Sequence, residues 1–345
     1  MYNLFKTNIF FAVSLLLLLL AGAHNPAYAG DRYSLKPFRP KIFASVTDFF
    51  SQIQNSQILL RVDSLLKAAG IYVLAVSACN LDTSVIPPTS TKKDTGTSSA
   101  SIKALSANML LFPVPFFFNQ AQRIAEFAKY ARKLDPDVIF LQEVWDNISL
   151  ALLVASFPEY HAIFSAGIGY NYSGLLVLSK FPPKTSKIRR FPLSLQHSIE
   201  ELIAQKSMLI IEVERCGKPI YLLNTHLYSA SPQQQYRPNL DQFDLMTATI
   251  MNLPGAVVIG GDMNLRPEEL DPRLPTGINR DDCTLPTAGY PKLSKKLDYI
   301  MSKAGPGEII IISGRRVDPV IRFSDHNPIF ANINFSDSKL VQPAR

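Results

Sequence analysis

Short apolar runs alternate with amphipathic segments between residues 102 and 335, and polar residues follow the runs closely. Such runs are typical of buried β-strands, whereas an apolar face that recurs every three to four residues indicates a helix. The alternation predicts a mixed α/β fold whose functional side chains lie just past strand ends. We expect strands over 102–106, 138–141, 174–178, 208–213, 220–223, 256–259, 297–301 and 309–312, and helices over 119–134 and 240–251.

The sequence Gly260-Gly261-Asp262-Met263-Asn264 directly follows the apolar run 256–259. Asp262 and Asn264 stand two positions apart, so their side chains should project to the same side where the strand ends. The two glycines allow another backbone or a ligand to come close. Oxygen ligands in such a place suit a divalent cation or a phosphate, although Gly-Gly-Asp also forms ordinary turns.

Five further strand-end positions carry side chains capable of catalysis or metal binding. Each has a simpler explanation when taken alone, because an asparagine can cap a turn, a glutamate can face solvent and a histidine can be satisfied within a loop. Their recurrence at one strand end after another favours a shared site. The positions are Asn108, Glu143, His226, Asp298 and the adjacent Asp325-His326.

The chemistry of these residue types fits phosphodiester hydrolysis. In-line attack on phosphorus builds charge on the non-bridging and leaving oxygens, where a cation helps most. The attacking water needs a base that titrates near neutral pH, and histidine is such a base. An aspartate beside that histidine fixes which ring nitrogen faces the water. A site with few carboxylate and carboxamide ligands suits Mg²⁺, which keeps several of its waters.

The order Asn, Glu, His, Asp-x-Asn, Asp, Asp-His along the chain resembles the endonuclease/exonuclease/phosphatase (DNase I-like) superfamily. The resemblance spans essentially all of residues 102–335 and implies a four-layered α/β sandwich, in which two packed mixed β-sheets are flanked by helices. The matching stretches are Ser106-Ala107-Asn108, Leu141-Gln142-Glu143-Val144-Trp145-Asp146, Ser173-Gly174-Leu175-Leu176-Val177-Leu178-Ser179, Asn224-Thr225-His226-Leu227, Gly260 to Asn264, Leu297-Asp298-Tyr299-Ile300 and Ser324-Asp325-His326-Asn327-Pro328.

The resemblance also implies metal-dependent hydrolysis of a phosphate ester. It implies Glu143 as the principal metal ligand, with Asn108 and Asp325 near the same ion. We expect this ion to be Mg²⁺, with Mn²⁺ or another divalent cation as alternatives.

The same resemblance implies roles for the remaining site residues. His326 resembles the water-activating base of the family, steered by Asp298. His226 would face the opposite side of the phosphorus, as an acid or as a group that stabilises the leaving oxygen. Asp262 and Asn264 would hold the nucleophile and a phosphate oxygen.

The form of the motifs favours a lipid phosphodiesterase of the sphingomyelinase or phospholipase C type. The stretch 143–146, the Ser173-Gly174 pair and Gly-Gly-Asp-Met-Asn are similar to those of secreted sphingomyelinases. Lys206 stands where that group often has a Lys-Gly pair, with Ser207 in place of the glycine. The substrate expected from this resemblance is a phosphodiester with a lipid headgroup.

The stretch Leu110 to Phe118 reads Leu-Leu-Phe-Pro-Val-Pro-Phe-Phe-Phe and follows the first expected strand. It should therefore lie on the same rim as Asn108. An exposed aromatic cluster there would enter a lipid interface and contact the membrane surface beside the site. The alternative is that these side chains pack under the following helix, since aromatic runs are usually part of a core.

Two other functions remain open from the sequence. A secreted DNase I-like endonuclease would use the same residues, with a basic loop at Lys184 to Arg190 tracking the nucleic acid backbone. The net charge of +7 favours an anionic partner of either kind. The non-enzymatic alternative is a surface-binding protein that retains the fold without turnover, although a degenerate site normally loses some of these side chains.

The N-terminus has the pattern of a cleavable signal peptide over residues 1–29. Lys6 precedes an apolar run from Ile9 to Ala23, and Ala27-Tyr28-Ala29 supplies a small-x-small cleavage site after Ala29. We therefore expect a secreted or periplasmic protein, with an uncleaved anchor as the alternative. Cys79 follows Val76-Ser77-Ala78, which resembles a bacterial lipidation signal and makes a lipid anchor a second alternative.

The remaining chain divides by composition. Residues 30–83 form a region to which the sequence assigns no role, and 84–101, rich in Pro, Ser, Thr, Gly and Lys, are typical of a flexible linker. The catalytic domain is expected over 102–336, followed by a tail over 337–345. Three cysteines are too few for a disulfide framework, and whether Cys216 and Cys283 pair stays open, as does the oligomeric state.

Overall fold

In the computed structural model, two β-sheets and the helices packed on them form the described part of the chain. The structure describes residues 83–90, 101–111, 119–145, 147–165, 171, 173–192, 204–229, 237–289, 292–319 and 323–337. The expected signal peptide, Cys79, Asp146, residues 112–118 of the aromatic stretch and the tail after residue 337 lie outside these ranges.

The strands of these residues form two β-sheets, one of seven strands and one of six. The seven-stranded sheet has the order β1-β4-β5-β3-β2-β13-β12, and the six-stranded sheet has the order β10-β11-β9-β8-β7-β6. Their bounds are β1 Thr83–Ile86, β2 Ser101–Leu111, β3 Val138–Val144, β4 His161–Ser165, β5 Leu176–Ser179, β6 Pro183–Arg190, β7 Ser207–Arg215, β8 Lys218–His226, β9 Ala256–Asp262, β10 Ile278–Arg280, β11 Asp298–Lys303, β12 Glu308–Arg316 and β13 Ile329–Asp337.

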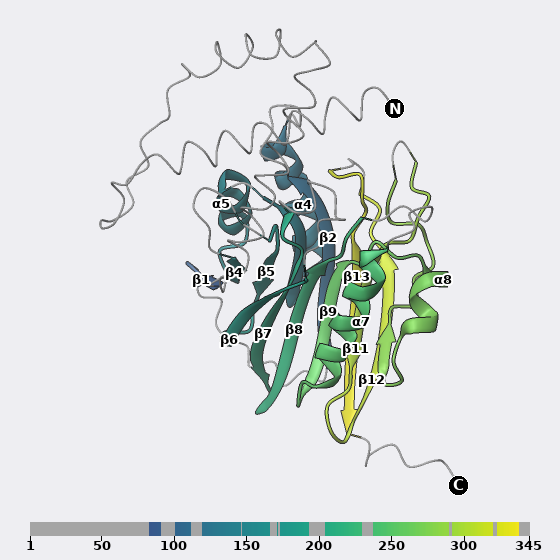
Figure 1. Ribbon diagram of the computed structural model, residues 1–345. Coiled ribbons are helices and arrows are strands. Elements are labelled where there is room, and N and C mark those ends of the chain that lie inside the picture. The colour runs from purple at the N-terminus through teal and green to yellow at the C-terminus, as the bar shows by residue number, and fades with distance from the viewer. Residues whose placement is uncertain are drawn as a thin grey trace, which may run out of the picture. The chain divides into compact units, whose positions relative to one another are not determined.

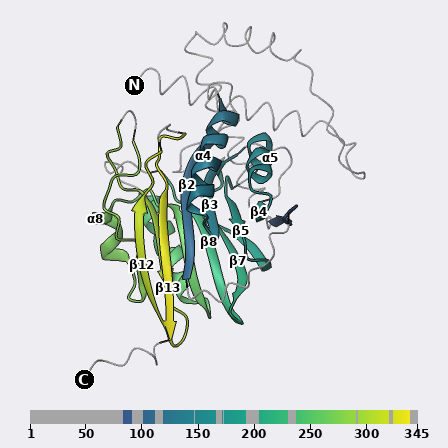
Figure 2. The ribbon, with the colours of Figure 1, turned by 180° about the vertical axis from the view of Figure 1, so that it is seen from behind.

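Helices cover the outer face of each sheet. One hydrophobic cluster joins side chains of both sheets, such as Phe140 and Val258, and therefore lies between them. A second cluster packs α4 and α5 on the seven-stranded sheet, and a third packs α7 and α8 on the six-stranded sheet. Figure 1 shows α7 in front of its sheet, and Figure 2 shows α4 over β2 and β3 from behind. The four-layered sandwich is thus confirmed. The helices are α4 Gln120–Leu134, α5 Asn147–Ser156, α7 Pro238–Met251, α8 Pro267–Leu270 and the 3₁₀ turn η1 Asp271–Arg273.

Strand direction brings the predicted site residues to one edge of the two sheets. β2 runs parallel to β3, and β8 runs parallel to β9 with His226 opposite Asp262. β11 is antiparallel to β9, so its first residue, Asp298, pairs with the last residue of β9, Asp262. The prediction that each site residue closes a strand is therefore wrong for Asp298, which opens β11, and for the Asp325-His326 pair, which precedes β13. They reach the same edge because those strands run in the opposite direction.

The two glycines of the Gly-Gly-Asp motif allow the close approach that the sequence predicted. A Cβ atom at Gly260 would lie 2.3 Å from Phe140 Cδ2, across the interface between the sheets. A Cβ atom at Gly261 would lie 2.4 Å from the carbonyl oxygen of Thr225 on the neighbouring strand. Only glycine fits at these two positions without a shift of the sheets.

Several local predictions need correction. The expected linker 84–101 overlaps β1, which pairs with β4, and reaches β2 at Ser101. Lys184 to Arg190, the expected basic loop, instead belong to β6, which pairs with β7 at the edge of the six-stranded sheet. Side chains in the second half of β6 alternate between exposed and partly buried positions. Asn119 precedes α4 but adopts a left-handed conformation and makes no side-chain cap. No helix among the described residues is long and apolar enough to cross a membrane.

Candidate active site

Asn108 joins the acidic residues of the two sheets at the centre of the site. Its Nδ2 donates to Glu143 Oε1 at 2.7 Å and to Asp262 Oδ2 at 3.1 Å. Its Oδ1 accepts a hydrogen bond from the Leu110 backbone N–H at 3.1 Å, which fixes the orientation of the amide. One carboxamide therefore sets the positions of a carboxylate from each sheet.

Glu143 lies near the end of β3 in a left-handed conformation, with φ of 57°. Such a conformation is uncommon for a residue with a side chain and persists where the surroundings hold it. The Val144 backbone N–H donates to the Gly174 carbonyl at 2.9 Å, and Asn171 Nδ2 donates to the Val144 carbonyl at 2.9 Å. Gly174 packs so closely on Trp145 that a Cβ atom there would lie 2.9 Å from the indole ring. The Ser173-Gly174 and Glu-Val-Trp motifs thus form one support for Glu143.

The carboxylate of Glu143 has one oxygen without a hydrogen-bond partner. Oε1 accepts from Asn108, whereas Oε2 is buried and has no such partner among the described residues. Burial raises the pKa of Glu143 to about 7, against the opposing effects of the Lys206 charge and the Asn108 hydrogen bond. Burying such a carboxylate oxygen without a partner destabilises the folded protein unless a cation binds it.

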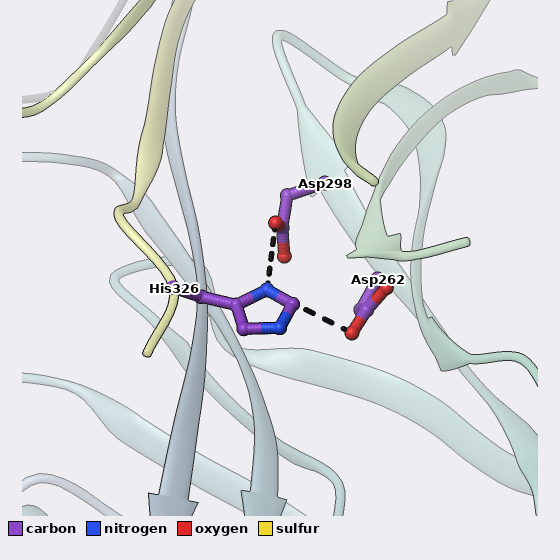
Figure 3. A group of neighbouring side chains, drawn as sticks. All are labelled: Asp262, Asp298 and His326. Atoms are coloured by element: carbon purple, nitrogen blue, oxygen red, sulfur yellow. Dashed lines mark hydrogen bonds and ion pairs between the residues drawn. The ribbon is translucent and has the colours of Figure 1, made fainter. Parts of the chain in front are cut away.

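Asp298 and His326 form a buried hydrogen-bonded pair beside Asp262. His326 Nδ1 lies 2.8 Å from Asp298 Oδ2 and 3.9 Å from Asp262 Oδ2. Figure 3 shows the three side chains directed toward one another. Burial lowers the pKa of His326, but the charges of Asp298 and Asp262 outweigh it and raise this pKa to about 10. The two carboxylates therefore favour the charged form of the imidazole, and its expected role as the water-activating base stays a prediction.

His226 approaches the same carboxylates from the end of β8. Its Nε2 lies 3.5 Å from Asp262 Oδ2 and 3.9 Å from Glu143 Oε1. Burial places the pKa of His226 well below its usual range, and the charges of Lys206 and His326 lower it further. Burial, followed by the charge of Asp298, raises the pKa of Asp262 to about 6. Both histidines thus lie within 4 Å of the same oxygen, Asp262 Oδ2, and the pKa of one is lowered while that of the other is raised.

Asn264 turns away from Asp262 instead of repeating its direction. The residue has a φ of 48°, and its Nδ2 donates to the Leu227 carbonyl at 3.0 Å. Its backbone N–H donates to Asp262 Oδ1 at 3.0 Å. Asn264 therefore steadies the Asp262 carboxylate and lines a neighbouring pocket with His326.

That pocket has a volume of about 220 Å³ and is lined by His326 but not by His226. Asn264, Arg266 and Asp325 also line it. Asp325, the third expected metal ligand, also lies close enough to Glu143 to raise its pKa. The structure thus brings together all eight predicted site residues, with Asn264 contributing mainly through its backbone and the pocket wall.

Comparison with known proteins agrees with this geometry. The model of the Endonuclease/Exonuclease/phosphatase family matches residues 105–326. The chain belongs to this family. A 5'-tyrosyl-DNA phosphodiesterase of Caenorhabditis elegans is 32% identical over 162 residues, covering 45% of this chain and 41% of that protein. An inositol phosphosphingolipids phospholipase C of Saccharomyces cerevisiae is 30% identical over 149 residues, covering 39% of this chain and 31% of that protein.

The chain spans less than half the length of these two curated relatives. Among solved structures, sphingomyelinase C from Streptomyces griseocarneus has a TM-score of 0.55 at 17% identity, over 67% of this chain and 99% of that one. This likeness supports the endonuclease/exonuclease/phosphatase fold, and members of the family with related sequences are phosphodiesterases.

Three further residues support this endonuclease/exonuclease/phosphatase site, and of these only Lys206 was noted from the sequence. Arg123 of α4 donates to the carbonyls of Met109 and Leu110 and to that of Phe323, which ties the end of β2 to the segment before Asp325. Lys206 is buried near Glu143 and His226, whose pKa values it lowers. Its position before Ser207 was the available signal.

Thr287 is the third residue, and it holds the segments on both sides of the Asp298–His326 pair. Its buried hydroxyl accepts the backbone N–H groups of Leu297 and Asp298, each at 3.1 Å. Its carbonyl accepts the Asn327 N–H at 2.8 Å. Nothing in the local sequence distinguishes this threonine from an ordinary loop residue.

The residues present fit a divalent cation. The unpartnered Glu143 Oε2 and the oxygens of Asn108 and Asp325 are hard ligands of the kind that Mg²⁺ prefers. A second set, Asp262, Asp298 and His326, has its ligand atoms within 4.8 Å of one another. In that set, however, His326 Nδ1 is already bonded to Asp298, and a nitrogen ligand suits Mg²⁺ less well than oxygen.

Proposed function

We propose that this protein is an exported, Mg²⁺-dependent phosphodiesterase that cleaves its substrate by in-line attack of water. The observation that carries the proposal is the arrangement around Asn108, which holds Glu143 and Asp262 together while Glu143 Oε2 keeps a buried free lone pair. The Asp298–His326 pair lies directly beside it. This arrangement supplies a cation site and proton-transfer groups within a few ångströms.

In this proposal Glu143, Asn108 and Asp325 hold the cation, which neutralises charge on the phosphate oxygens. Asp262 is positioned by the Asn264 backbone and lies between His226 and His326. These groups hold the attacking water and the phosphate, and Asp298 fixes the ring of His326. His226, whose pKa is lowered by burial, would face the opposite side of the phosphorus and serve the leaving oxygen.

A lipid phosphodiester is the first candidate substrate. The helix α5 begins shortly after Glu143 and carries no charged residue. It exposes an apolar face, with Ile148 74% and Leu152 37% exposed. An apolar face at the rim of the site suits contact with a membrane surface. Of the aromatic stretch expected there, Leu111 is buried in the core, and residues 112–118 lie outside the described part.

A DNA phosphodiester is the second candidate, favoured by the likeness to 5'-tyrosyl-DNA phosphodiesterases. The strand β6 gives this candidate less support than a basic loop would. Lys184 pairs with Glu214, and Arg189 donates to Thr249 at 2.8 Å, so two of its cations already have partners. Export rests on the signal-peptide pattern of residues 1–29 alone.

The test is a substrate panel with the purified protein. Sphingomyelin vesicles, phosphatidylinositol vesicles, supercoiled plasmid and bis(4-nitrophenyl) phosphate are incubated with Mg²⁺ and, in parallel, with EDTA. We expect turnover that EDTA abolishes and Mg²⁺ restores. Turnover that persists in EDTA would contradict the metal assignment. Failure to cleave any of the four substrates would favour a protein that retains the fold without activity.

A further inference from the structure

The pocket beside His326 carries two cationic side chains that the proposed chemistry does not use. Arg266 follows β9 by four residues, and Lys295 precedes Asp298 by three, so the strand pair β9–β11 brings them to one rim. Both line the pocket of about 220 Å³ that Asn264 and His326 also line. A group bound there would therefore lie next to the scissile phosphate.

Neither cation is neutralised strongly by its neighbours. The nearest carboxylate oxygen to the Arg266 guanidinium belongs to the exposed Glu268, at 3.8 Å, and exposed pairs of this kind contribute little. Lys295 is exposed, and none of the described residues forms an ion pair with it. Both head groups therefore remain available to a ligand.

The carboxylates that border the pocket are engaged elsewhere. Glu269 Oε1 accepts from Arg237 Nη2 at 2.8 Å, and Glu269 Oε2 accepts the Arg266 backbone N–H at 3.0 Å. Asp325 is one of the residues that we expect around the cation. The charge left over at the far side of the pocket is thus positive.

This lining does not suit a quaternary ammonium group. Recognition of choline normally uses aromatic faces, often as a cage. None of the described residues that line the pocket is Phe, Tyr or Trp, and Arg266 and Lys295 would repel a cation. An arginine fork and a lysine ammonium instead match the oxygens of a phosphate.

We propose that this pocket binds a second phosphate group of the substrate, adjacent to the phosphodiester that is cleaved. Arg266 and Lys295 contact that second phosphate, while Asn264 and His326 mark the side of the pocket that faces the scissile bond. The inference rests on the proposed function and narrows its substrate from phosphodiesters in general to those with two phosphates. Two sources share this chemistry: a nucleotide with a neighbouring backbone phosphate, and a phosphorylated inositol headgroup.

The experiment compares substrates that differ by one phosphate. The nucleotide pair is the 4-nitrophenyl ester of thymidine 5'-phosphate with and without a 3'-phosphate. The lipid pair is phosphatidylinositol and phosphatidylinositol 4-phosphate in phosphatidylcholine vesicles. We expect the doubly phosphorylated member of one pair to have a kcat/KM higher by about tenfold or more. This is the gain that one or two additional charge-assisted hydrogen bonds to the second phosphate would give. The pair that shows this preference identifies the source.

Variants assign the preference to the pocket. In Arg266→Gln and Lys295→Ala the preference should fall to about twofold or less, while hydrolysis of bis(4-nitrophenyl) phosphate stays near that of the unaltered protein. Lys292→Ala is the matched control, because Lys292 is an exposed lysine of the same loop that does not line the pocket. It should keep the full preference.

Binding provides a readout that does not depend on turnover. Calorimetry with thymidine 3',5'-bisphosphate and thymidine 5'-phosphate, repeated with inositol 1,4-bisphosphate and inositol 1-phosphate, should show tighter binding of one bisphosphate to the full chain. Lys295→Ala should remove the difference. Equal affinity within both pairs, or a difference that Arg266→Gln and Lys295→Ala leave intact, would overturn the inference. Loss of bis(4-nitrophenyl) phosphate hydrolysis with a preserved binding preference would instead count against the proposed function alone.

Discussion

His326 Nδ1 lies 2.8 Å from Asp298 Oδ2, and this single contact joins the segment before β13 to the first residue of β11. Asp298 lies in the six-stranded sheet and His326 in the segment leading into β13 of the seven-stranded sheet, so their hydrogen bond links the two sheets. Because Asp298 fixes one ring nitrogen, the other nitrogen has a defined direction. The pair should lose its function when either partner changes.

We expect His326→Ala to lower turnover by roughly a hundredfold or more, since it removes a proton-transfer group. Asp298→Asn should lower it too, because an amide no longer stabilises the charged ring in the same orientation. Both are measured as kcat on bis(4-nitrophenyl) phosphate with saturating Mg²⁺. Thermal unfolding and circular dichroism verify that each variant is folded. If both variants fold and their kcat is unchanged, Asp298 and His326 are not catalytic residues.

The raised pKa of His326 predicts how the metal-free protein responds to pH. The folded protein binds this proton more tightly than the unfolded chain, so the stabilisation is complete below the unfolded pKa of 6.5 and is lost as pH rises through about 10. Urea unfolding in EDTA should therefore show a free energy of unfolding that falls between pH 8 and pH 10. In His326→Gln this fall should be reduced. Parallel curves for the two proteins would mean that the imidazole is not held in its charged form.

Glu143→Gln should lower activity without lowering the stability of the fold. The amide is neutral and nearly isosteric, so it removes a buried carboxylate whose Oε2 has no hydrogen bond. In EDTA we expect the variant to unfold at the same temperature as the unaltered protein or at a higher one. Its Mg²⁺ affinity, measured by calorimetry, should fall by about tenfold or more, and its turnover should fall with it. A variant that is less stable in EDTA but binds Mg²⁺ normally would contradict the assignment of Glu143 as a ligand.

Thr287→Val keeps the shape of the side chain but removes the acceptor of two backbone N–H groups. Leaving buried donors unpaired should lower the free energy of unfolding by about 1–3 kcal/mol. It should also lower kcat, since the segment that carries Asp298 loses its anchor. Thr287→Ser, which restores the acceptor, should recover most of both quantities. Thr287→Ser failing to recover kcat would show that the hydroxyl does not position the pair.

The apolar runs were sufficient to predict a mixed α/β fold and most of its inner strands, because strands such as β3 and β9 are buried on both faces. The four-layered sandwich came from the resemblance to the superfamily. The edge strands were harder. β6 carries Lys184 and Arg190 along a solvent-facing edge, so its composition is that of a loop. β1 is only four residues long and is followed by Pro87-Pro88 and a Ser/Thr-rich segment, so its pairing with β4 rather than its composition determines it.

The candidate site was predicted residue by residue because its side chains stand beside strands in a fixed order along the chain. What the sequence did not contain was the network behind them. Arg123, Lys206 and Thr287 act through carbonyls, charges and backbone N–H groups of residues far away in the chain. Such partners depend on the register of both sheets, and a local pattern carries no information on that register.

The position of β13 has a consequence for when the site can exist. β13 pairs with β2 on one side and with β12 on the other, so the strand that carries Asn108 gains this neighbour only after residues 329–334 have been made. Asp325 and His326 also come late in the chain. During synthesis the candidate site therefore stays incomplete until β13 and the segment before it have been made.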